Sequence, residues 1–109
     1  MNISGSDIQH NKAIVQDWFD SLGLQINKAP VAQTEDEKLN LRLKIARKEC
    51  AARVLKYYED HPIMTNVPEL RKIVQSTFID ELARWNREDL IMLTSRVLAI
   101  ETLKAFGYE

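Results

Sequence analysis

Chemically reactive residue types are few in this chain. Cys50 is the only cysteine, and His10 and His61 are the only histidines. A metal site built on thiolates or imidazoles needs several such ligands at short spacing, and the sequence contains no Cys-x-x-Cys or His-x-x-x-His pair. Cys50 follows Ala46 and precedes Val54 at helical spacing, where a cysteine usually serves as a small apolar side chain. We therefore expect no metal site, no cofactor and no catalytic residue.

Basic residues are the other group that could do chemistry, and they concentrate in one segment. Residues 38–58 contain seven basic residues and a single acidic one, Glu49, although the formal net charge of the chain is −1. Four of the basic residues share one sector of a helical wheel, namely Lys38, Arg42, Arg53 and Lys56. Such a sector either faces an anionic partner, including nucleic acid, or is neutralised within the fold.

Intramolecular neutralisation is the favoured interpretation of this basic sector. The segments on either side of residues 38–58 are acidic, and Glu49 falls inside the sector. No zinc-finger spacing, RNP-like segment or Gly-rich phosphate loop accompanies it. Nucleic-acid binding is therefore the alternative hypothesis.

Helical spacing of apolar residues predicts the elements that position these side chains. The expected helices cover residues 7–22, 35–60, 68–85 and 87–106. Gly23 is expected to end the first helix in the left-handed conformation, and residues 24–33, which include Pro30, form a connector. Residues 1–5 are expected to be disordered. Because no strand-like alternation is present, we predict an all-α, four-helix bundle-like single domain over residues 1–109.

Recognisable signals mark the starts of the later helices. Thr34 followed by Glu37 is a capping box for the second helix. Pro68 is tolerated in the first turn of the third helix, with Asn66 or Val67 as its N-cap. The link to the fourth helix is short, with Asn86 as its N-cap, which favours an antiparallel hairpin.

Two of the expected helices carry more apolar surface than one contact can cover. The second helix has one apolar stripe through Cys50 and another on the opposite side, made of Leu41, Ile45, Ala52 and Leu55. In the fourth helix, 11 of the 17 residues from Leu90 to Phe106 are apolar and lie on all sides. A helix of that kind is expected at the centre of the fold, covered by the others.

These patterns predict a small, non-enzymatic helical interaction protein. It would act as a regulator, an adaptor or a complex subunit, bind a protein partner and form a homodimer through the Leu41–Leu55 stripe. The alternative is a nucleic-acid-binding protein that uses the basic sector. The first residues lack the features of a secretory signal, no apolar stretch is long enough for a membrane span, and Cys50 is unpaired. We therefore expect a cytoplasmic protein with no membrane contact.

Overall fold

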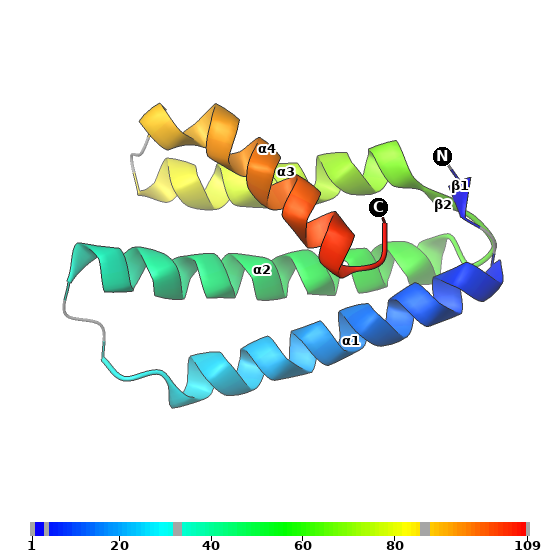
Figure 1. Cartoon of the computed structure of the whole chain (residues 1–109), viewed down its shortest axis with the longest axis horizontal. Helices are drawn as coiled ribbons and strands as arrows, with labels where there is room; N and C mark the ends of the chain where they lie inside the picture. The colour runs from blue at the N-terminus through cyan, green and yellow to red at the C-terminus, as the bar shows by residue number, and fades with distance from the viewer. Residues whose placement is uncertain (1, 4, 32–33, 86–87, 109) are drawn as a thin grey trace.

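The computed structural model describes residues 2–3, 5–31, 34–85 and 88–108. Within these ranges the chain forms four helices and one short pair of strands, in the order β1 (Asn2–Ile3), α1 (Gly5–Lys28), α2 (Glu35–Asp60), β2 (Thr65–Asn66), α3 (Val67–Arg84) and α4 (Glu88–Ala105). The helices pack against one another and confirm the predicted all-α, bundle-like fold (Figure 1). The bounds of α2, α3 and α4 agree with the predicted ranges to within one residue at each end.

The predicted signals at the starts of α2 and α3 form the expected hydrogen bonds. The backbone N–H of Glu37 donates to Thr34 Oγ1 at 3.1 Å, and the Thr34 hydroxyl donates to the Glu37 carboxylate at 3.0 Å. At α3 the backbone N–H of Glu69 donates to Asn66 Oδ1 at 3.1 Å, which identifies Asn66 as the N-cap. The predicted cap of the fourth helix, Asn86, lies outside the described residues.

The first helix is longer than the sequence predicts. It continues through Gly23 to Lys28, so residues 24–28 are helical and not part of the connector. Gly23 does not adopt a positive φ, and its Cα faces the side chain of Lys48 on α2. Packing of α1 along α2 holds the extra turn in place, which agrees with the general dependence of helix length on tertiary contacts.

The N-terminal residues also differ from the expectation of disorder over residues 1–5. Asn2–Ile3 forms an antiparallel pair with Thr65–Asn66, and α1 already begins at Gly5. The partner strand comes from the loop between α2 and α3. A pairing between segments so far apart in the sequence leaves no local pattern that could have predicted it.

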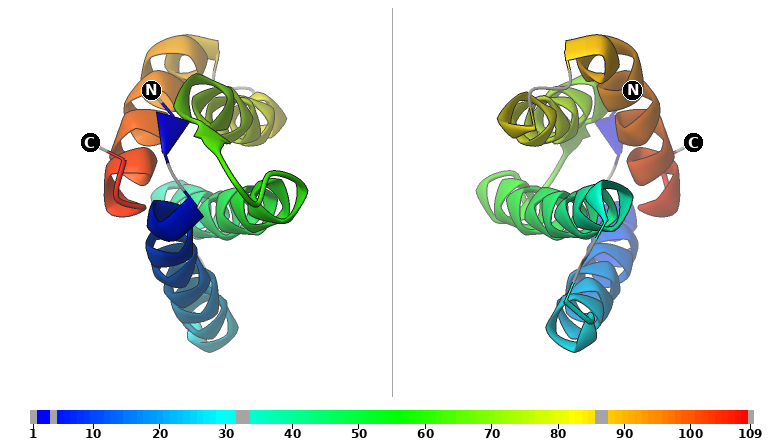
Figure 2. Two further views of the ribbon diagram at one scale, coloured as in Figure 1. Left: turned by 90° about the vertical axis from the view of Figure 1, so that its right-hand side faces the viewer. Right: turned by 90° about the vertical axis from the view of Figure 1, so that its left-hand side faces the viewer.

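The central helix is α2, and the prediction that the fourth helix occupies the centre is wrong. α2 packs against α1 on one side and α3 on the other, whereas α4 packs mainly on α3 and lies at the edge of the molecule (Figures 1 and 2). The side chains of Met92 and Leu93 on α4 are 70% and 71% exposed. The apolar residues of α4 lie on all sides of the helix, but the other helices cover only one of these sides.

The predicted buried stripe of α2 forms the middle of the core. Cys50 and Val54 are fully buried there. From the other helices the core receives mainly large apolar side chains, which include Ile8, Val15, Leu70, Val74, Phe78, Leu103 and Phe106. Every helix therefore contributes to one continuous core.

A left-handed turn ends α4. Gly107 has a φ of +94°, a conformation that strongly favours glycine. The N–H of Tyr108 donates to the carbonyl of Leu103 at 2.8 Å, and the N–H of Gly107 donates to the carbonyl of Lys104 at 3.0 Å. These two bonds form a Schellman motif, which satisfies the last carbonyls of the helix.

The same end of α4 is attached to α1 and α2. Buried Asn11 on α1 donates a hydrogen bond from Nδ2 to the carbonyl of Phe106 at 2.6 Å. The Phe106 ring packs edge-to-face on Trp18, with 4.8 Å between ring centroids. The hydroxyl of Tyr108 forms a hydrogen bond with that of Tyr58 on α2, and both side chains are buried. α4 is thus fixed at its C-terminal end by two other helices.

Candidate functional site

The predicted dimer stripe of α2 is largely covered by the chain itself. Leu41, Ile45 and Leu55 are half-buried, and only Ala52 is exposed. Leu55 packs against the core, and Leu41 lines a shallow pocket beside Pro30 in the α1–α2 connection. The large apolar side chains that are exposed among the described residues lie elsewhere. The stripe therefore offers little free apolar surface.

Each of the four residues predicted to face an anionic partner has a carboxylate oxygen within 3.6 Å of its basic nitrogen. The pairs are Lys38–Glu35 at 3.5 Å, Arg42–Glu81 at 2.7 Å, Arg53–Glu49 at 3.2 Å and Lys56–Asp60 at 3.6 Å. All but the Arg42–Glu81 pair lie within α2 and are exposed, so each of these contributes about 0–1 kcal/mol. The charge of the basic sector is thus balanced mainly by carboxylates of the same helix.

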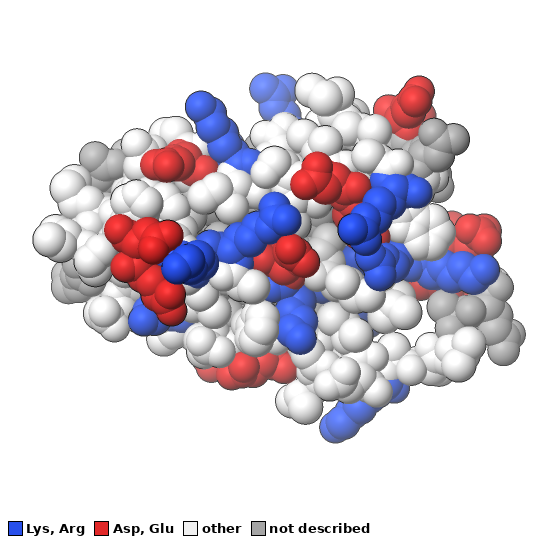
Figure 3. Space-filling model, turned by 180° about the vertical axis from the view of Figure 1, so that it is seen from behind, with Lys and Arg blue, Asp and Glu red and all other residues white. Residues whose placement is uncertain are grey.

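The surface charge agrees with this pairing. On the face drawn in Figure 3, acidic side chains lie directly beside the basic ones, including the group of basic side chains at the right of the view. Binding to a nucleic-acid backbone depends on several basic side chains that are free to neutralise phosphates. The paired side chains of the basic sector do not provide such a surface.

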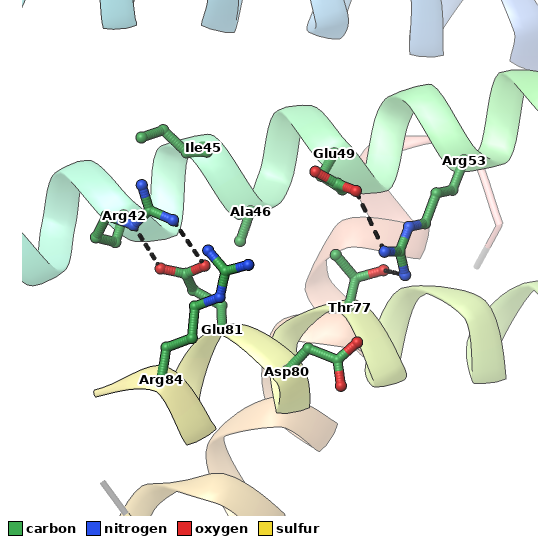
Figure 4. A pocket seen from close by; sticks show the side chains of 9 residues that line it. All are labelled: Arg42, Ile45, Ala46, Glu49, Arg53, Thr77, Asp80, Glu81 and Arg84. Atoms are coloured by element: carbon green, nitrogen blue, oxygen red, sulfur yellow. Dashed lines mark hydrogen bonds and ion pairs between the residues drawn. The ribbon is translucent and has the colours of Figure 1, made fainter. Parts of the chain in front are cut away.

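A polar cleft of about 130 Å³ lies between α2 and α3 (Figure 4). Its lining consists of Arg42, Ile45, Ala46, Glu49, Arg53, Thr77, Asp80, Glu81 and Arg84. Arg42 donates from Nε to Glu81 Oε1 at 2.7 Å and from Nη2 to Oε2 at 3.2 Å, and Arg53 Nη1 donates to Thr77 Oγ1 at 2.9 Å. Both arginines thus bridge α2 and α3.

Charges within this cleft are balanced. Its three arginines face three carboxylates, so the lining has no net formal charge. Burial alone would raise the pKa of the Glu81 carboxyl, but hydrogen bonds from Arg42 and from the Trp85 indole outweigh it and place that pKa below its usual range. The same bond to Glu81 raises the pKa of Arg42. The side chains of this cleft therefore link α2 to α3 by hydrogen bonds and an ion pair.

Three further titratable side chains are buried in the core, namely Cys50, Tyr58 and Tyr108. Cys50 is fully buried, and burial raises the pKa of its thiol to about 12. Burial also raises the pKa values of the paired Tyr58 and Tyr108 hydroxyls. Among the described residues, no group of three or more His, Cys, Asp or Glu side chains is arranged to hold a metal ion. No helix in the described ranges combines the length and apolarity that a membrane span requires.

A continuous apolar surface lies on the outer side of α4. We call it the α4 apolar face, and it consists of Met92, Leu93, Val97 and Ile100, which are 70%, 71%, 45% and 42% exposed. Beside Met92 and Leu93, a shallow groove also lined by Gln75 and Arg96 separates α4 from α3. Exposed apolar residues scattered singly are normal on soluble proteins, but a contiguous group on one helix marks a contact surface.

Comparisons with known proteins give no relative for this chain. No protein family, curated protein or solved structure matches it. Any function must therefore be argued from the surfaces described above. Of these, the α4 apolar face has exposed groups without an intramolecular contact to explain them, while Arg42 and Arg53 in the α2–α3 cleft are bound by other side chains of the cleft.

The sequence contained one signal for the α4 apolar face that the central-helix interpretation concealed. Leu93, Val97 and Ile100 are spaced by four and three residues, which places them on one side of a helix. Arg96 and Glu101 flank this side, whereas Ser95 and Thr102 lie on the opposite side and are buried. Leu98 and Leu103 are buried as well, so apolar residues lie on both the buried and the exposed side of α4. The sequence alone therefore could not indicate which side stays exposed.

Proposed function

We propose that this chain is a non-enzymatic helical interaction protein that binds a protein partner through the α4 apolar face. The observation that carries the proposal is the exposure of Leu93 and Met92, together with Val97 and Ile100 on the same side of the helix. Recognition of this kind places the apolar side of one helix against another helix or groove, with anchors spaced by three or four residues. A regulator, an adaptor and a complex subunit would all use such a surface.

The chemistry of the other candidate sites supports a binding role over catalysis. Cys50 is buried with a raised pKa, so its thiol is a poor nucleophile at neutral pH. In the α2–α3 cleft, Glu81 is held as a carboxylate by Arg42, and a carboxylate with a lowered pKa is a weak base. Neither group is poised for proton transfer or attack on a substrate.

Nucleic-acid binding by the basic sector is the less favoured alternative. Arg42, the sector's most buried member, is committed to Glu81, and the other three pair with carboxylates of α2. A gel-shift assay with generic DNA and RNA at two salt concentrations tests this alternative. We expect no complex even at low salt. Salt-dependent binding that is lost in an Arg53→Glu variant would favour the alternative instead.

Quantitative affinity capture tests the proposed function. The tagged chain, a Leu93→Glu variant and a Leu24→Glu variant are compared as baits in an extract of the native source, to which the untagged chain is added. Leu24 is 58% exposed on α1 and is the matched control, because it gives the same chemical change away from α4. We expect at least one protein, the untagged chain included, to be captured by the unaltered bait and by Leu24→Glu but lost with Leu93→Glu. If Leu93→Glu retains every captured protein, the α4 apolar face is not the binding surface.

A further inference from the structure

We infer that the α4 apolar face receives the same face of a second copy of this chain, with the two α4 helices parallel. This inference rests on the proposed function, because it names the partner of that surface. Its basis is the arrangement of two charged residues, Arg96 and Glu101, around the apolar residues of the face. Their positions favour one partner and one relative orientation.

The apolar residues form a seam of the kind that joins two helices. Leu93, Val97 and Ile100 repeat at spacings of four and three, as in the alternating core positions of a coiled coil. In both views of Figure 2, α4 lies at the edge of the molecule. Because Leu93, Val97 and Ile100 are all exposed, a second helix can contact them along this seam.

Two charged residues of opposite sign border the seam. Arg96 precedes Val97 and Glu101 follows Ile100, so each lies roughly 70° from the centre of the seam, on opposite sides. Both side chains are exposed, and neither takes part in a salt bridge or side-chain hydrogen bond within the described part of the chain. They are the two positions that form salt bridges between the helices of a parallel coiled coil.

Symmetry then decides the orientation. In a parallel pair the two-fold axis runs along the helices and brings opposite flanks together, so Arg96 of each copy faces Glu101 of the other and two salt bridges form. In an antiparallel pair, the Arg96 side of one copy meets the Arg96 side of the other. A register that aligns the apolar residues of the two seams would then bring the two Arg96 side chains together. The charges complement one another only in the parallel arrangement.

The seam is short, so the association is expected to be weak. Lys104 occupies the core position that follows Ile100, one residue before α4 ends, and two lysines there repel each other. Among the side chains that the structure describes, three apolar residues per copy thus form the contact. Measurements must accordingly be made at a protein concentration of about 100 μM, where complexes with micromolar dissociation constants are populated.

Disulfide trapping tests the orientation. Leu93→Cys and Ile100→Cys variants are each oxidised mildly with glutathione disulfide, and covalent dimer is quantified on non-reducing gels. A disulfide needs Cα atoms within about 7 Å, so only directly facing positions are linked. We expect each variant to form dimer by itself. Native Cys50 is buried and stays unlinked, and a Leu24→Cys variant on α1 measures random collision.

Charge exchange tests the proposed salt bridges. By sedimentation equilibrium, Arg96→Glu and Glu101→Arg are each expected to raise the dimer dissociation constant about tenfold, because two attractive pairs become repulsive. The double variant restores both pairs and is expected to return to within about threefold of the unaltered chain. An equimolar mixture of the two single variants should form a heterodimer.

Three outcomes would overturn the inference, and each differs from a failure of the proposed function. Covalent dimer that forms only when Leu93→Cys is mixed with Ile100→Cys means an antiparallel pair. A double charge variant as weak as the single variants means that Arg96 and Glu101 do not meet. A chain that stays monomeric at about 100 μM and forms no more disulfide than Leu24→Cys excludes the second copy altogether. In that last case, a different protein lost from capture by Leu93→Glu would still support the proposed function.

Discussion

Replacement of Gly107 by alanine is expected to weaken the attachment of α4 to α1. Gly107 has a φ of +94°, where an L-residue with a Cβ is strained. A Cβ at this position would also overlap the side-chain amide nitrogen of Asn11, the group that donates to the carbonyl of Phe106. One methyl group therefore disturbs both the turn that ends α4 and the buried hydrogen bond that fixes that turn to α1.

The size of the effect follows from these two contributions. A left-handed conformation costs a non-glycine residue about 1–2 kcal/mol. If Asn11 moves away to make room, the buried carbonyl of Phe106 loses its donor, which costs about 1–3 kcal/mol. Because partial movement can relieve part of each penalty, we expect Gly107→Ala to lower the free energy of unfolding by about 2–4 kcal/mol.

Urea unfolding followed by circular dichroism measures this change. With an m-value of about 2 kcal/mol per molar urea, the midpoint is expected to fall by about 1–2 M. Gly23→Ala is the matched control, since Gly23 lies inside α1 and its added Cβ would be in ordinary contact with Lys48 at 3.6 Å. That change should raise stability by about 0.5–1 kcal/mol, because alanine favours a helix interior.

Two results would refute this reasoning. One is a Gly107→Ala midpoint equal to or above that of the unaltered chain. The other concerns coupling: Asn11→Ala removes the group that the new methyl would strike, so the double variant should be less destabilised than the sum of the two single changes. Strict additivity would mean that Gly107 and Asn11 do not touch.

Further predictions concern the cleft, the buried thiol and a helix cap. Glu81→Gln should destabilise the fold by about 1–3 kcal/mol because it removes the carboxylate that Arg42 binds, whereas Glu35→Gln, at an exposed pair, should cost under about 1 kcal/mol in urea titrations. The pKa of Glu81 is lowered by folding, so its stabilising contribution is present above the unfolded-state pKa and lost as pH falls through the folded-state pKa. The difference in free energy of unfolding between the unaltered chain and Glu81→Gln should therefore become smaller in acid. Cys50 should react with a thiol reagent at neutral pH only as fast as the chain unfolds, and instantaneous labelling would contradict its burial. Thr34→Ala should cost about 1 kcal/mol through loss of the α2 cap, and an unchanged urea midpoint would show that the cap contributes nothing.

Local signals were enough to place α2, α3 and α4. Thr34 and Asn66 each accept a hydrogen bond from the backbone N–H three residues later, so both caps can be recognised from the local sequence. Gly107 and the Schellman turn at the end of α4 are equally local. Gly23 carries the same residue type without the same conformation, because α1 continues along α2 through a contact that lies outside its own segment.

The sequence shows the basic residues as a group but not which carboxylates lie beside them. Arg42 and Glu81 are separated by 39 positions and meet only because α2 and α3 pack side by side. Arg53 reaches Thr77 on α3 for the same reason. The basic sector and the acidic segments around it are visible in the sequence. Whether the basic side chains are free or paired could be decided only from the distances between their nitrogens and the nearest carboxylate oxygens.

By itself, the sequence determined that the chain is helical, where α2 to α4 begin and end, and that its apolar residues exceed what one contact per helix can cover. Tertiary structure alone decided which of those residues remain exposed. Periodicity records which side chains share a side of a helix, such as Leu93 and Val97 on one side of α4 and Leu98 on another. Whether a side is covered depends on which neighbouring helix occupies the space beside it, and that is set by the packing of segments distant in the chain.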